Sequence, residues 1–257
     1  MAEKMGIEER IAHFLRVSED AGATQAERDT AGQAAERLLA KHAVDRLTID
    51  VDGARRAERE AIERATLRVT GGRGTIALDV VVGLIAAARA LGLVAHYRDH
   101  RTADRSPDGG STGPHVELVV TGFASDLVLA VPLLESLAVQ AALAMRSWWR
   151  GDPRHRLIQR WDAHLARCEF AREFGRGAAA RLTAGRDDAI AATGSTGTAL
   201  VVASREAAVQ DWVEHHVQVR QATDRRSFSG YGRAPGYAAG LRSSGSAQRA
   251  IAPGAAR

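Results

Sequence analysis

The sequence predicts a helix-rich α+β protein, in which an N-terminal helical hairpin precedes a small sheet of about three strands packed by helices. Three observations lead to this prediction. Several long segments repeat apolar residues every three or four positions, which is the spacing of an amphipathic helix. Two shorter apolar segments flank a polar loop, as in a β-hairpin. Aromatic residues make up 5% of the chain, so its core must consist mainly of Ala, Leu, Val and Ile.

Residues 1–46 are expected to form the helical hairpin. Apolar residues within 7–17 fall on one face of a first helix. Thr24 begins a second helix, and Glu27, three residues later, completes a capping box. Alanines along the second helix would allow the two helices to approach closely.

This N-terminal segment resembles a known family. The resemblance rests on Ile11, Phe14, Leu15, Glu27, Ala31, Ala34, Leu38, Leu39, Lys41, His42 and Asp45. These residues are similar to the N-terminal module of the bacterial and phage family called domain of unknown function 2786, although Leu39 stands where Met is frequent. The resemblance implies a helical hairpin and a phage or mobile-element origin. It implies no particular activity.

Two later patterns also resemble longer members of that family. One is a strand ending at Gly122, followed by an apolar helix that begins near Asp126. The other is a patch at Phe170, Phe174 and Gly175 that continues to Arg181 and Leu182. Residues 52–73 have no recognised counterpart. Both patterns imply a fold without any attached chemistry.

Residues 47–74 are expected to form a linker helix followed by a glycine-rich turn. Between residues 52 and 64, Arg, Glu and Ala dominate, and Arg56, Glu60 and Arg64 follow one another at a spacing of four. Such oppositely charged pairs are typical of a solvated helix.

An α+β domain is expected over residues 75–223. A buried helix at 76–91 precedes two strands, at 93–97 and 115–121, which form a hairpin with a long polar loop. A third strand is predicted at 199–203.

Two long helices are predicted between the second and third of these strands. The first covers residues 127–149 and is apolar enough to suggest a membrane span, but Pro132, Glu135 and Gln140 are costly in hydrocarbon, so no membrane association is expected. The second begins near residue 158 with a buried stripe that includes Trp161, and a shift in its apolar phase predicts a kink or break near 168–170.

Residues 224–257 are rich in Gly, Ser, Arg and Ala and predict a flexible basic tail. Cys168 is the sole cysteine, which excludes an intramolecular disulfide and a cysteine-rich zinc site. The N-terminal residues show no secretory signal. A cytoplasmic location is therefore expected.

No familiar enzyme class is predicted. Ser111 has the letters of a nucleophile elbow, but it lies in a polar loop before Pro114 and lacks the required strand and helix. No glycine-rich loop has the spacing of a phosphate-binding motif. We therefore predict no catalytic or cofactor-binding residue.

Histidines and carboxylates gather around the hairpin without a recognised metal motif. His96 and His100 are four apart, and Asp99, Asp104 and His115 lie nearby. Two histidines four residues apart can bind one metal ion when they lie on the same face of a helix, but this segment is predicted to be strand and loop. No metal ligand is predicted. A deep polar pocket lined by residues such as His96, Asp99, Glu117 and Asp126 would contradict this view.

A nucleic-acid-binding cluster is the main functional hypothesis. It consists of Arg146, Trp149, Arg150, Arg154, Arg156 and Arg160. Arginines neutralise phosphates while aromatic rings stack on bases, as in proteins that bind single strands. The same pattern also suits a solvated junction between helices. The net charge of +4 is modest and nearly all basic residues are arginine, so composition alone does not decide.

The predicted function is that of an accessory protein that binds nucleic acid without sequence specificity. Two alternatives stay open. One is a protein-interaction or assembly module, including self-association, which uses the apolar helix at 127–145 and the pair Trp148–Trp149. The other is an unrecognised hydrolase.

Overall fold

The computed structural model describes residues 60–71, 75–101, 113–193, 196–218, 220, 224 and 226–243, together with scattered positions before residue 60. The helical hairpin predicted for residues 1–46 lies largely outside this range, although described positions within it, such as Phe14 and Ala35, are helical. Most of the polar loop, including Ser111, also lies outside the described residues.

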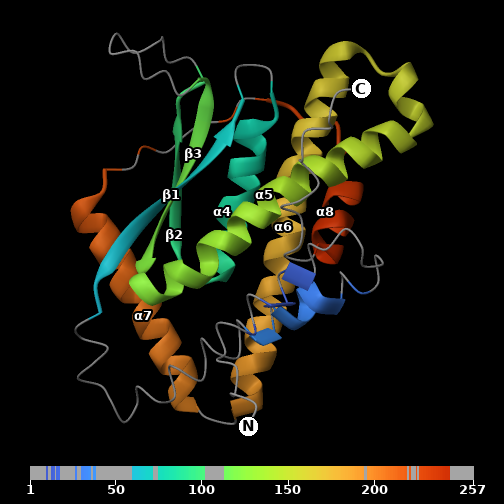
Figure 1. The fold of residues 1–257 in the computed structure, drawn as a ribbon. Helices are drawn as coiled ribbons and strands as arrows, with labels where there is room; N and C mark the ends of the chain where they lie inside the picture. Colours follow the sequence, from blue (N-terminus) through green and yellow to red (C-terminus); the bar gives the residue numbers. More distant parts are fainter. Residues whose placement is uncertain are drawn as a thin grey trace, which may run out of the picture.

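The described chain is a helix-rich α+β fold, as predicted (Figure 1). Its elements, in chain order, are β1 (Ile62–Thr70), α4 (Ala77–Ala90), β2 (Val94–Asp99), β3 (His115–Phe123), α5 (Ala124–Gly151), the 3-10 helix η1 (Pro153–Leu157), α6 (Arg160–Thr193), α7 (Thr196–His216) and α8 (Arg233–Arg242).

The sheet contains three antiparallel strands in the order β1-β3-β2. Leu118 on the central strand pairs with Leu67 on β1 and with Tyr97 on β2. The hairpin predicted from the two apolar segments is confirmed as β2 and β3. Because alternate residues of a strand face opposite sides, Val116, Leu118 and Val120 all point into the core shared with the helices.

The third strand is β1, and the prediction for this part of the chain was wrong. A linker helix was predicted for residues 52–64, but the residues from Ile62 onward form a strand. Residues 52–59 lie outside the described residues. Along β1, Ala65, Leu67 and Val69 pack against the core, which is the period-two alternation of a half-buried strand. In the sequence, the oppositely charged residues spaced four apart indicated a helix, and the alternation was therefore not recognised.

The strand predicted at 199–203 is also wrong, because these residues lie within α7. Both edges of β3 are already paired with β1 and β2. The helix instead buries Val209 and Val213, and it contacts β2 and β3. Helical packing has therefore overridden the strand preference of a short β-branched run.

Helices α4 and α5 cover one face of the sheet, and α6 packs behind them, with α8 against its far side (Figure 1). Helix α6 runs unbroken through residues 168–170, so of the predicted kink or break, the break is wrong. The shift in apolar phase has another cause: α6 is buried against α4 on one side and α8 on another. Trp161, which was predicted to be buried, is 62% exposed.

A flexible tail was predicted for residues 224–257, but residues 233–242 form helix α8. Gly232, Gly236 and Gly240 lie four residues apart and form one ridge that faces α6. A Cβ added at Gly236 would lie 2.5 Å from the carbonyl oxygen of Phe170, and one at Gly240 would lie 2.0 Å from that of Phe174. Few apolar side chains are needed because the backbones themselves are in contact.

A similar close contact joins α6 to α4. A Cβ added at Gly175 would lie 2.2 Å from the carbonyl carbon of Gly83. Helix α6 is therefore fixed on two sides by contacts that tolerate no larger residue.

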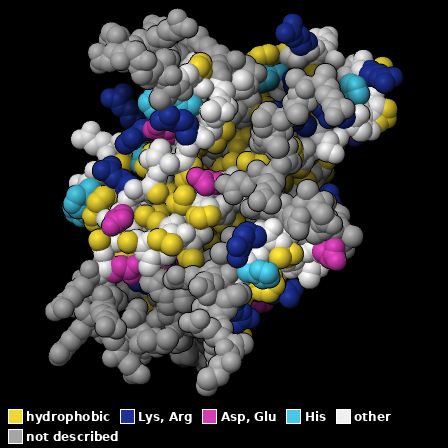
Figure 2. Space-filling model, viewed as in Figure 1, with side chains coloured by type: hydrophobic (Ala, Val, Ile, Leu, Met, Phe, Trp, Pro, Cys, Tyr) yellow, Lys and Arg dark blue, Asp and Glu magenta, His cyan; other side chains and the backbone are white. Residues whose placement is uncertain are grey.

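Helix α5 is the one helix among the described residues that is long and apolar enough to cross a membrane. Core helices often pass the same test. Its buried residues, such as Leu134 and Leu137, pack in the core under the sheet. Its outer face carries Val128, which is 68% exposed. Figure 2 shows hydrophobic side chains gathered over this helix.

The glycine ridge gives a direct test of the packing of α8. We expect Gly236→Ala to lower the free energy of unfolding by about 1–3 kcal/mol, because the added methyl group clashes with the backbone of Phe170. Gly185→Ala in α6 is the control, since a Cβ there meets nothing within 4 Å, and it should stabilise by about 0.5–1 kcal/mol. Denaturant unfolding measures both changes. Equal stability of the two variants would contradict the packing of α8 on α6.

Candidate nucleic-acid interface

The six predicted site residues lie around the junction of α5 and α6. Arg146, Trp149 and Arg150 belong to the last turns of α5, Arg154 and Arg156 to η1, and Arg160 begins α6. Asp152 shapes the turn between them: its carboxylate accepts a hydrogen bond from the Arg154 backbone N–H at 3.0 Å, and Pro153 begins the 3-10 helix.

A cavity of about 420 Å³ lies where the end of β1, the start of α4, α5 and α6 meet. Three of the predicted residues line it, namely Arg146, Trp149 and Arg150. Val80, Ala138 and Met145 contribute apolar surface. The cavity is thus partly apolar, and two exposed arginines from one face of α5 stand beside it.

Arg167 is a lining residue that the sequence analysis missed. It comes from α6, and its guanidinium carbon lies 5.4 Å from the ring centroid of Trp149, within the range of a cation–π contact. The contact holds a third guanidinium at the cavity and fixes the position of the indole. Only the folded packing of α5 against α6 brings these two residues together.

The electrostatics of the cavity favour an anion. Its lining among the described residues contains three arginines and no carboxylate. His164 also lines it; burial, with the nearby charge of Arg167, lowers the pKa of this imidazole, so it is neutral at pH 7. The positive charge of the site therefore comes from guanidinium groups, which stay protonated at any physiological pH.

The other predicted arginines do not line this cavity. Arg154 forms an ion pair with Asp152 at 2.7 Å and lies 4.6 Å from the ring centroid of Tyr231, so its charge is already compensated. Arg156 and Arg160 are exposed on η1 and at the start of α6. The structure therefore divides the predicted cluster into a cavity-lining part and an outer part.

Two described arginines of the C-terminal segment are used in packing. Arg226 donates to Asp79 at 2.8 Å, and Arg233 lies 3.5 Å from Glu169. These two side chains contact α4 and α6, so this part of the predicted basic tail is packed against the fold. A second cavity is lined by Trp161 of α6 and by Phe228 of the C-terminal segment.

Cys168 is the one thiol of the chain, and its neighbours have the residue types of a nucleophilic triad. Its Sγ lies 3.5 Å from Nε2 of His164, and the thiol also interacts with the carboxylate of Asp79. Burial and the charge of Asp79 raise the pKa of this thiol to about 12. The thiolate is the nucleophilic form, so this buried thiol is unsuited to catalysis.

A second polar cluster lies on the sheet, where His100 and His115 meet at Glu117. In the sequence, Glu117 was considered with His96, Asp99 and Asp126, and its grouping with His100 and His115 was not predicted. His96 is half-buried further along β2, opposite Val119, and Asp99 binds Arg101. Asp104 lies outside the described residues.

Asp126, which was named as a further lining residue of a polar pocket, does not join this cluster. It begins α5 and pairs with Arg205 of α7 at 2.9 Å. The signal for the pairing of His115 with Glu117 was available in the sequence, because residues two apart on a strand share a face.

Comparisons with known proteins give no match: no protein-family model, no curated protein and no solved structure is similar to this sequence. The resemblance to the domain of unknown function 2786 family therefore stays a prediction.

The raised pKa of Cys168 predicts an inert thiol. In the native protein at pH 8, we expect 5,5′-dithiobis(2-nitrobenzoic acid) to react far more slowly than in the denatured protein, since the thiol is fully buried and protonated. The rate of thionitrobenzoate release measures this difference. A native rate equal to the denatured one would show that Cys168 is accessible and reactive.

Proposed function

We propose that the protein binds single-stranded nucleic acid without sequence specificity, at the cavity between α5 and α6. The observation that supports this proposal is the convergence of Arg146, Arg150, Arg167 and Trp149 on one partly apolar cavity whose described lining has no carboxylate. The proposed function is the one predicted from the sequence, and the proposed site is reduced to Arg146, Trp149 and Arg150 with the addition of Arg167.

The two kinds of lining suit the two parts of a nucleotide. Guanidinium groups bind phosphate oxygens through paired N–H donors and displace counterions. An aromatic ring and an apolar wall accept the face of a base, which contributes about 1–3 kcal/mol for each stacked base. The volume of about 420 Å³ falls in the range of small-molecule sites, so an unstacked base can enter.

The same lining supports binding without sequence specificity. Base identity is read through several hydrogen bonds to base edges. Besides its arginines and His164, the polar side chains of the described lining are Thr70 and Thr75, together with the indole of Trp149. Contacts to phosphate and to a base face serve every sequence equally.

A protein interface on α5 is the second candidate function. Val128 is 68% exposed on a helix that is otherwise strongly apolar, and hydrophobic side chains gather over this helix in Figure 2. Association through such a face depends little on salt, whereas phosphate binding weakens steeply as salt rises. Ionic strength therefore separates the two candidates. A phage or mobile-element origin, implied by the family resemblance, is a further proposal.

The test is a fluorescence-anisotropy titration of a labelled single-stranded oligonucleotide at low and moderate salt. The double variant Arg146→Ala/Arg150→Ala should bind more weakly to every sequence and should reduce the salt slope by about two contacts. Arg176→Ala/Arg242→Ala removes the same charge from α6 and α8, away from the cavity, and should bind nearly as well as the wild-type protein.

Each contrary result has a defined meaning. If the wild-type protein binds no oligonucleotide at low salt, the proposed function is wrong. Equal losses in both double variants would reject the cavity as the site and leave a general charge effect. Salt-independent self-association in sedimentation experiments, without oligonucleotide binding, would favour the interface on α5.

A further inference from the structure

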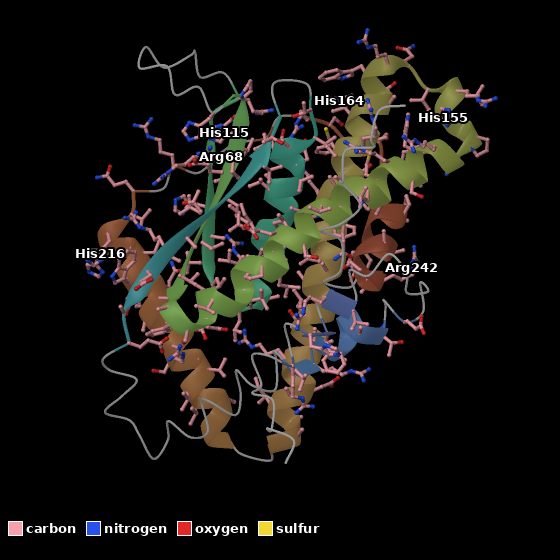
Figure 3. All side chains as sticks on the ribbon, viewed as in Figure 1. Arg68, His115, His155, His164, His216 and Arg242 are labelled. Carbon is pink, nitrogen blue, oxygen red and sulfur yellow. The ribbon has the colours of Figure 1, made fainter. Side chains whose placement is uncertain are left out.

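The outer face of the sheet carries a cluster of histidine, glutamate and arginine side chains. Glu117 is paired across the sheet with Arg68 on β1 and with Arg98 on β2, so all three share a face. His115 precedes Glu117 by two residues on β3 and shares that face as well. Figure 3 shows Arg68 and His115 beside one another at this end of the sheet.

His100 reaches the same carboxylate from the end of β2. Its Nε2 lies 3.5 Å from one oxygen of Glu117, and Nε2 of His115 lies 3.4 Å from the other. The two imidazole rings are stacked, with centroids 4.8 Å apart. The three donor atoms all lie within 4.8 Å of one another.

The hydrogen bond between Nδ1 of His115 and Gly113 determines which ring nitrogen carries the proton. Nδ1 lies 2.8 Å from the carbonyl oxygen of Gly113, and because a carbonyl can only accept, Nδ1 carries a proton. In a neutral imidazole, Nε2 then presents a lone pair toward Glu117. A lone pair and a carboxylate repel each other unless a cation, either a proton or a metal ion, lies between them.

We propose that His100, His115 and Glu117 form a binding site for a divalent first-row transition metal such as Zn²⁺. Zinc bonds of about 2.0–2.1 Å in a tetrahedral site place ligand atoms roughly 3.3–3.4 Å apart. The separation between each imidazole nitrogen and its nearer Glu117 oxygen is close to this value. Metal-binding histidines commonly donate a hydrogen bond from the nitrogen that does not bind the metal, and the carbonyl of Gly113 accepts such a bond from Nδ1 of His115.

Two imidazole nitrogens and one carboxylate form the ligand set of several catalytic zinc sites, which leaves the fourth position for water or a substrate. The proposal therefore goes beyond nucleic-acid binding, because it places an open metal site on the sheet. The site is built from described residues at the adjoining ends of β2 and β3, together with Gly113 just before β3.

The neighbouring arginines set the strength of the site. Arg68 lies 3.5 Å from Glu117 and Arg98 lies 3.9 Å from it, and both side chains are about half exposed. They can turn toward solvent when a metal enters, but their charges oppose a dication. Burial alone would raise the pKa of Glu117, yet its hydrogen bonds with His115 and Arg68 lower it, so the carboxylate is ionised.

Isothermal titration of the chelator-treated full chain with ZnCl₂ tests the proposal. We expect one equivalent of zinc to bind the wild-type protein, with at least about tenfold weaker binding in His100→Ala and in Glu117→Gln. His215→Ala, which removes an exposed histidine on α7, is the matched control and should leave the affinity unchanged. Circular dichroism checks that each variant is folded.

A fourth variant distinguishes a metal site from a purely protonic cluster. Arg68→Ala removes a charge that opposes the ion, so it should tighten zinc binding several-fold. No zinc binding by the wild-type protein would overturn the proposal. Equal zinc binding by the wild-type protein, His100→Ala and Glu117→Gln would overturn it as well, because the zinc would then bind elsewhere.

Discussion

The rest of the described fold depends on the pairing of the buried Asp79 carboxylate with two arginines. Asp79 is 1% exposed, and it accepts hydrogen bonds from Arg172 of α6 at 2.6 Å and from Arg226 of the C-terminal segment at 2.8 Å. The ring of Phe228 lies beneath both guanidinium groups. A buried charge without partners is strongly unfavourable, so α4 dictates where α6 and the C-terminal segment must lie.

The arginine-lined cavity depends directly on this arrangement of helices, whereas the histidine cluster depends on it less. Helix α6, held by α4 and by the glycine ridge of α8, brings Arg167 to Trp149 at the end of α5 and so completes the arginine-lined cavity. The histidine cluster depends on strand pairing instead. Antiparallel register places His115 and Glu117 next to the end of β2, where His100 follows.

Local patterns in the sequence predicted the elements whose apolar spacing is regular, namely α4, α5, β2 and β3. They failed where a distant partner decides the structure. Strand β1 needs β3 to pair with, and its charged residues resembled a helix. Helix α8 shows almost no apolar stripe because Gly236 and its neighbours pack backbone on backbone. Likewise, Arg150 and Trp149 were found as chain neighbours, whereas Arg167 reaches its site through a tertiary contact alone.

Unfolding of Asp79→Asn as a function of pH is the most direct test of this account. Burial raises the pKa of Asp79, but hydrogen bonds and charges from Arg226 and Arg172 outweigh it and lower the pKa below its ordinary value of 3.8. The ionised carboxylate therefore stabilises the fold above that pH, and this contribution is lost as pH falls below it. At pH 7 we expect Asp79→Asn to cost about 3–5 kcal/mol, a deficit that shrinks in acid, while exposed Asp188→Asn has little effect. A loss below about 0.5 kcal/mol at pH 7, as for an ordinary surface substitution, would contradict the account.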